Sequence, residues 1–244
     1  MKTNFKKDIF TILFWIVVFV ISTYFFFNSI SDYLLGKLEA RRASEKWWLV
    51  VHFTGAACTL FLGPLQFWAP FRNRFRNWHR IAGKFYIGGS IIAAIMVFYL
   101  LSNYPLPGAI PSLGLLAIIW LFTTIVAFWF AVKKNFKQHK QFMIRSYVCG
   151  LAFVFIRLFS TTDKYTGVFG FMENKEVRFT VYEWLCWVYP LMITEFLLVW
   201  YPLLSKQKES DAKPGANMGI AASWARRWSN RLRFAMQQRF RLDE

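Results

Sequence analysis

Six long apolar segments set the strongest constraint on what this chain can fold into. They cover about residues 9–27, 47–68, 81–101, 113–132, 143–160 and 181–204. A transmembrane helix needs roughly 20 mainly apolar residues, and each segment meets that length. The first segment is too long for a signal peptide and no small-x-small site follows it, which indicates a retained anchor. The sequence therefore predicts an all-α membrane protein built as a bundle of six transmembrane helices.

The positive charge of the chain has a sidedness that orients this bundle. The 244 residues are 56% hydrophobic, with a formal charge of +17. This composition excludes a disordered chain, a disulfide-stapled scaffold and an ordinary soluble enzyme. With six spans, 22 Lys and Arg residues fall on one side and 7 on the other. The positive-inside rule then places both termini in the cytoplasm of a multi-pass protein, which we assign to a bacterial inner membrane. Topology explains most of the charge, so we expect no nucleic-acid partner.

A basic amphipathic segment is predicted after the last span. The expected organisation is a bundle over residues 1–204, a linker over 205–219 and a surface helix over 220–242. Apolar residues of this helix recur at four-residue spacing, and arginines occupy most of its other faces: Ile220, Trp224, Trp228, Leu232, Met236 and Phe240. Such a helix is suited to anionic lipid head groups. Packing on the protein's own loops, or binding of a partner, are the alternatives.

Ionisable residues inside the membrane mark candidate sites, because each is costly to place there. By a rise of 1.5 Å per residue, His52 and Arg157 lie roughly 8–9 Å from the outer boundary, and Glu183 opens the last span at the same end. The three form a candidate outer polar site. The alternative is an Arg157–Glu183 pair that closes the bundle, with His52 donating to a carbonyl.

A second level of polar residues lies at the inner boundary. His79 and His139 sit on different helices at one depth, beside Arg72, Arg80 and Arg145. Two such imidazoles can supply the axial nitrogens of a b-type haem iron, and arginines can neutralise its propionates. A metal held by the two histidines is a further reading, but no third ligand is evident.

Two more residues belong to the inner level. Gly83 lies one turn from His79 and would let a porphyrin approach. Glu195 lies about 9 Å from the same boundary and is the acidic residue there. The alternative for the whole group is that interfacial side chains extend to the lipid head groups.

Small residues indicate which spans pack closely. Gly55, Thr59 and Gly63 recur every four residues on span two, and Gly89 and Ala93 on span three. The Gly63-Pro64 pair predicts a kink that brings Gln66 and the following arginines under the bundle. Spans one and four carry few polar residues and are predicted to be a lipid-facing scaffold.

These residues together resemble a family of predicted membrane proteins catalogued as domain of unknown function 2306. The resemblance covers about residues 50–200 and rests on His52, the run 63–67 (GPLQF), Arg72, the run 79–84 (HRIAGK), His139, the run 142–147 (FMIRSY) and Arg157. It implies a polytopic membrane fold. A looser resemblance, to helical haem proteins of the cytochrome b561 type, implies that His79 and His139 form one haem site.

Three function classes follow from the sequence. The first is a b-type haem redox protein that passes electrons to or from quinone or a small oxidant. The second is a non-redox transporter or sensor subunit that uses the outer His/Arg/Glu site. The third is a membrane assembly factor that acts through its tail. No hydrolase or nucleotide-binding motif is present, so catalytic residues are not assigned and enzymatic activity stays open.

Overall fold

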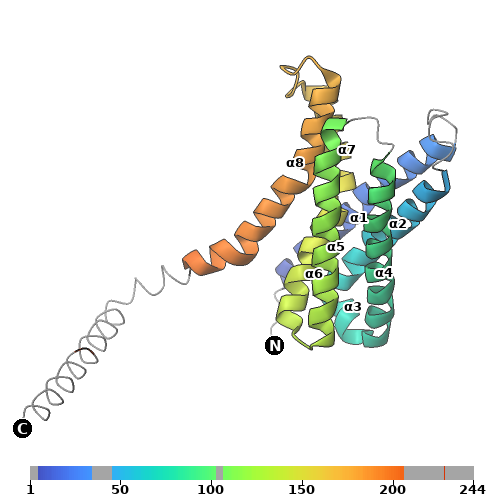
Figure 1. Cartoon of the computed structure of the whole chain (residues 1–244). Helices are drawn as coiled ribbons and strands as arrows, with labels where there is room; N and C mark the ends of the chain where they lie inside the picture. Colours follow the sequence, from blue (N-terminus) through green and yellow to red (C-terminus); the bar gives the residue numbers. More distant parts are fainter. Residues whose placement is uncertain (1–4, 35–45, 103–106, 206–227, 229–244) are drawn as a thin grey trace, which may run out of the picture. The chain divides into compact units, whose positions relative to one another are not determined.

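The structure is a computed structural model that describes residues 5–34, 46–102, 107–205 and 228. These residues form helices and no strand (Figure 1). In chain order the elements are α1 (Phe5–Leu34), α2 (Lys46–Phe67), α3 (Ala69–Arg74), α4 (Arg76–Leu101), η2 (Pro107–Ala109), α5 (Ile110–Val132), α6 (Phe136–Gly150), α7 (Ala152–Thr166), α8 (Lys175–Glu195) and the π-helical turn η3 (Phe196–Trp200).

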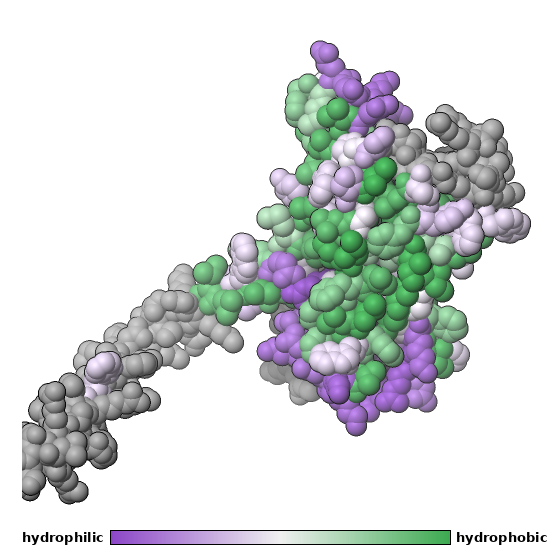
Figure 2. Space-filling model, in the orientation of Figure 1, coloured by the Kyte–Doolittle hydropathy of each residue, from purple (hydrophilic) through white to green (hydrophobic). Residues whose placement is uncertain are grey.

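The helices confirm an all-α membrane protein. Within the described ranges, five apolar stretches in helices are long enough to cross a membrane: Ile12–Ser31, Trp47–Phe67, Arg76–Leu101, Pro107–Val132 and Lys175–Ser205. The pair α6 and α7, bent by 44°, makes six if it counts as one crossing. Figure 2 shows hydrophobic side chains over the middle of the bundle and hydrophilic ones gathered toward two ends.

The chain divides into two compact units, Met1–Thr194 and Glu195–Glu244. The first contains the helical bundle and most of the candidate residues. The predicted linker and surface helix lie outside the described residues, apart from Ser205 and Trp228. Their assignment therefore stays a prediction.

Helices α2 and α4 approach closely through small residues, as the sequence predicted. A Cβ atom on Gly55 would lie 2.6 Å from the carbonyl oxygen of Gly89, which is closer than atoms can approach. Beside this contact, the buried hydroxyls of Thr59 and Ser90 are hydrogen-bonded at 2.6 Å. Small side chains and interhelical hydrogen bonds are the usual means by which helices associate in lipid.

Helix α5 exposes apolar side chains such as Phe122 and Ile125, in line with a lipid-facing span four, but it also has a buried polar face that was not predicted. It packs between α4 and α6 and buries Ser112, Thr123 and Thr124. Ser112 donates to the carbonyl of Glu183 at 2.9 Å and accepts from the indole N–H of Trp187 at 2.9 Å. This face was not predicted because a few hydroxyl-bearing residues suffice to form an inward face on an otherwise apolar helix.

The fifth predicted span is broken in the middle. Leu151 lies between the last residue of α6 and the first residue of α7, and the two helices are bent by 44° relative to each other. A Cβ atom on the preceding Gly150 would lie 2.6 Å from the side-chain methyl of Thr59. The missing side chain therefore lets α6 approach α2 beside the break, and glycine is a common site of helix kinks.

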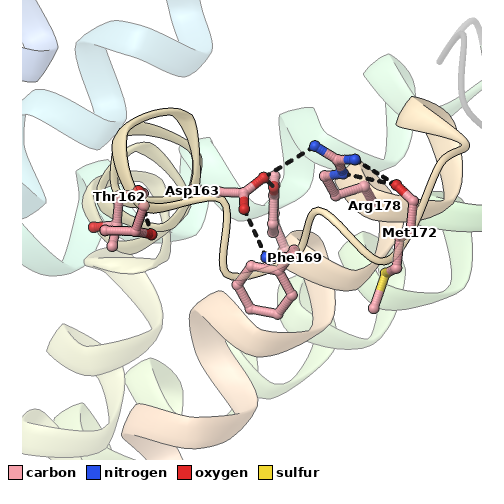
Figure 3. Close-up of polar contacts among 7 residues, drawn as sticks. Thr162, Asp163, Phe169, Met172 and Arg178 are labelled. Atoms are coloured by element: carbon pink, nitrogen blue, oxygen red, sulfur yellow. Dashed lines mark hydrogen bonds and ion pairs between the residues drawn. The ribbon is translucent and has the colours of Figure 1, made fainter.

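A carboxylate organises the turn between α7 and α8 (Figure 3). Asp163 accepts hydrogen bonds from the backbone N–H of Phe169 at 2.7 Å, from the Arg178 guanidinium at 3.3 Å and from the Tyr182 hydroxyl. Arg178 also donates to the carbonyl of Met172. These contacts fix the path of the chain from one helix to the next.

Candidate functional site

The two inner histidines line one cavity. His79 comes from the first turn of α4 and His139 from the first turn of α6. The cavity has a volume of about 1010 Å³ and lies between the ends of α2 to α6. Small-molecule and cofactor sites range over about 300–1,000 Å³, so a ligand the size of a cofactor can be accommodated.

Cations dominate the polar part of this cavity. Its described lining contains no carboxylate. Apart from the two histidines, it contains seven Lys and Arg side chains: Arg72, Arg76, Arg80, Lys84, Lys134, Lys137 and Lys140. The remaining wall is largely apolar and includes Phe67, Ile87, Phe128, Val132 and Met143. An amphiphilic anion matches this combination of surfaces, because its charge meets the cations and its apolar part meets the helices.

Sequence reasoning included only part of this lining. Besides the histidines it placed Gln66, Gly83 and several cations of the second loop region at this level, all of which line the cavity, and it left the α6 lysines and the end of α5 aside. Arg145 is not among the lining residues, and its guanidinium lies 5.1 Å from the ring centroid of Phe142. The lysines share the first turn of α6 with His139, and this spacing could have indicated them.

The imidazole of His139 is held in one tautomer. Its Nδ1 lies 2.8 Å from the carbonyl oxygen of Ala127 on α5. A carbonyl can only accept, so Nδ1 is the donor, and in the neutral imidazole Nε2 then has the lone pair. Metal-ligating histidines are usually oriented in this way, by donation from the other ring nitrogen to a carbonyl or carboxylate.

The start of α4 sets the position of His79. Phe75 interrupts the helix between α3 and α4, and its carbonyl accepts from the backbone N–H of His79 at 2.9 Å. The side chains of Arg72, Arg80 and His139 lie close enough to interact with His79 electrostatically. The Nδ1 atom of His79 is buried and has no hydrogen-bond partner among the described residues.

Hydroxyl groups tie together three of the helices that line the cavity. Tyr86 of α4 is hydrogen-bonded to Ser146 of α6 at 3.1 Å, and Ser146 to Thr124 of α5 at 2.7 Å. Thr124 also donates to the carbonyl of Trp120 at 2.7 Å. This buried chain fixes α4 and α6 relative to the helix that supplies the Ala127 carbonyl. It therefore helps to position both histidines.

The lining of this cavity contains two histidines that can bind a metal, His79 and His139. No group of three or more His, Cys, Asp or Glu residues that could hold an ion occurs in the described part of the chain. A haem needs only two axial ligands from the protein, because the porphyrin supplies the other four. The two histidines, the apolar wall and the cations fit that group.

His52 and Arg157, two of the predicted outer residues, contact different partners. His52 Nδ1 donates to the carbonyl of Ala93 at 3.0 Å, which is the alternative expected for this residue. Arg157 is exposed, and its guanidinium lies 5.5 Å from the ring centroid of Phe153. Glu183 is buried on α8.

Glu195, the acidic residue predicted at the inner level, belongs to the second compact unit, Glu195–Glu244. It ends α8 and begins the unit Glu195–Glu244, whereas the cavity residues lie in the unit Met1–Thr194. Its expected place at the inner level therefore stays a prediction.

Comparison with known proteins gives a family for most of the helical bundle. Residues 49–198, more than half of the chain, match a family model described as a predicted membrane protein, DUF2306. The match includes every residue that lines the cavity and leaves out the whole of α1. No curated protein and no solved structure matches the chain.

Proposed function

The chain belongs to the DUF2306 family of predicted membrane proteins, and from this premise we propose that it is a membrane redox protein with a b-type haem in the basic cavity. His79 and His139 would be the axial ligands of the iron. Haem, when bound, supplies one-electron transfer at its iron, and its potential depends on axial ligands and surroundings. The family description names no activity, so the proposal rests on the residues of the cavity.

One observation carries the proposal. Two histidines from different helices line the same cavity, which has no carboxylate in its described lining and contains seven Lys and Arg side chains. The hydrogen bond from His139 to Ala127 leaves Nε2 as the donor of a lone pair. The apolar wall suits a porphyrin ring, and the cations suit two propionates.

The electron partner and the membrane are further parts of the proposal. We assign quinone or a small oxidant as the acceptor or donor of electrons, with His52 and Arg157 near its head group. His52 Nδ1 donates to the carbonyl of Ala93, so in the neutral imidazole Nε2 is the atom that would accept a hydrogen bond from a quinol hydroxyl. A bacterial inner membrane, with residues 220–242 on anionic lipid, completes the proposed setting.

An absorption spectrum tests the proposal. The full chain is purified in detergent from cells supplied with a haem precursor, and spectra are recorded oxidised and reduced. We expect about one b-type haem per chain, and its loss in both His79→Ala and His139→Ala. His52→Ala is the matched control and should keep the haem, because it removes a histidine of the bundle that does not line the cavity. A wild-type protein without haem absorption would refute the proposal.

A further inference from the structure

We infer that Gln66 is a ligand-binding residue of the basic cavity, and that its side-chain amide donates to a carboxylate oxygen of the bound molecule. This inference rests on the proposed function, under which that carboxylate is a haem propionate. Gln66 lies in the last turn of α2 and lines the cavity together with the two histidines.

The side-chain amide of Gln66 is buried and lacks a hydrogen-bond partner for its N–H groups. Gln66 is 7% exposed, and its Nε2 atom has no hydrogen-bond partner among the described residues. Buried polar groups in proteins are nearly always hydrogen-bonded, and each exception requires an explanation. An unpartnered amide N–H on a residue that lines a cavity is explained when the occupant of the cavity is its acceptor.

The space around this amide depends on Gly83 of α4. A Cβ atom on Gly83 would lie 3.3 Å from Oε1 of Gln66, so the glycine leaves room for the amide against α4. Gly83 is one turn beyond His79, or about 6 Å along the helix. Gln66 therefore lies beside the turn of α4 that carries the proposed axial ligand.

The proposed acceptor of the amide N–H is a carboxylate. An amide N–H donates, and a carboxylate is the strong acceptor of a haem, whose other edges are hydrocarbon. The charged residues that line the cavity together with Gln66 include Arg72 and Lys84, and the described lining contains no carboxylate that would accept from the amide. The cations attract an anion from any direction, whereas a hydrogen bond from the neutral amide fixes the orientation of its carboxylate.

A binding experiment separates this contact from packing. The full chain is purified in detergent without haem, and haemin is titrated while the Soret band is followed. The same titration is made with haemin dimethyl ester, whose propionates carry no charge. For Gln66→Leu we expect haemin to bind about tenfold more weakly or worse, the effect of losing a hydrogen bond to a charged group. The ester should bind wild type and Gln66→Leu alike.

Two variants and a stability measurement complete the test. Gln141→Leu is the matched control, because Gln141 does not line the cavity, and it should bind haemin as wild type does. Gln66→Glu should weaken haemin binding more than Gln66→Leu, because like charges then meet. Without haem, Gln66→Leu should unfold at the same temperature as wild type or higher, since it removes an unpaired polar group.

The outcomes are distinct. Unchanged haemin binding by Gln66→Leu, or an equal loss with haemin and its ester, would overturn the assignment of Gln66 and leave the haem proposal standing. Loss of stability in the haem-free variant, with both ligands weakened, would show a packing role and would also overturn it. Failure of wild type to bind either ligand would overturn the haem proposal together with this inference.

Discussion

Single hydroxyl groups differ in their partners within this bundle. The Tyr86 hydroxyl is hydrogen-bonded to Ser146, whereas the buried Tyr147 hydroxyl has no partner among the described residues. The ring of Tyr147 packs against Gly63, where a Cβ atom would lie 2.1 Å from a ring carbon, and against the rings of Trp15 and Phe67. The ring of Tyr147 is therefore needed for packing, while its hydroxyl is not.

Removal of each hydroxyl should have opposite effects on stability. Tyr86→Phe breaks an interhelical hydrogen bond and should lower the free energy of unfolding by about 1 kcal/mol. Tyr147→Phe keeps the ring, removes an unpaired polar atom, and should leave that free energy unchanged or raise it. Unfolding by a denaturing detergent in mixed micelles, followed by circular dichroism, measures both. A greater loss for Tyr147→Phe than for Tyr86→Phe would contradict this account.

The two histidines of the cavity differ in the hydrogen bonding of their Nδ1 atoms. His139 has a fixed tautomer because the Ala127 carbonyl accepts from its Nδ1, and His79 has a buried Nδ1 without a partner in the described part of the chain. Their type and approximate depth could be predicted from the sequence. The hydrogen bond that orients His139 could not, because it comes from a helix whose sequence is apolar and carries no sign of a site.

Pairs of helices, rather than single ones, form the cavity. The contact of α2 with α4 brings Gln66 to Gly83, and the contact of α5 with α6 brings Ala127 to His139. Close approach of α2 and α4 depends on Gly55 and Gly89, where backbone meets backbone. A side chain at either position must push the helices apart, and the wall of the cavity would move with them.

Glycine substitutions on these helices test the close contact. Gly55→Ala places a methyl group 2.6 Å from the Gly89 carbonyl and should lower the free energy of unfolding by about 1–3 kcal/mol. Gly88→Ala is the control on α4, because no atom lies within 4 Å of its Cβ position. Its higher helix propensity should make it neutral or stabilising by up to about 1 kcal/mol. Equal stability of the two variants in detergent unfolding would count against the packing described here.

The unit Met1–Thr194 has a basic end and an apolar middle. The cavity opens among the arginines of α3 and α4 and the lysines of α6, and exposed aromatic residues such as Phe75, Trp78 and Phe136 flank it. The turn between α7 and α8, organised by Asp163, lies at the end away from α3 (Figure 1). By the positive-inside rule, we expect the basic end, and with it the cavity, to face the cytoplasm.

Thiol labelling tests that orientation. The three cysteines are replaced by alanine, and one exposed residue at each end is changed to cysteine. We expect a membrane-impermeant maleimide to label Tyr165→Cys in intact cells and to label Arg74→Cys only after the membrane is opened. Both side chains are exposed, so access depends on the side of the membrane alone. Labelling of Arg74→Cys in intact cells would reverse the proposed topology.

What the sequence determined by itself is the helical membrane fold, the small-residue contact of α2 and α4, and the residue types of the candidate site. These follow from local properties: segment length, apolar content, spacing of small residues and the unusual position of His79 and His139 near the membrane. The break between α6 and α7 and the inward face of α5 were not predicted, because each depends on what a neighbouring helix presents.

The set of residues that line one cavity together depends on the tertiary structure. Helix packing brings Gln66, Gly83, the two histidines and the α6 lysines to a common wall, although they are far apart in the chain. It also provides the Ala127 carbonyl that orients His139 and the hydroxyl chain that holds three helices together. Sequence periodicity gives the face of each helix, but the partner of that face is set by packing between helices, where shape and hydrogen bonds are matched across distant segments.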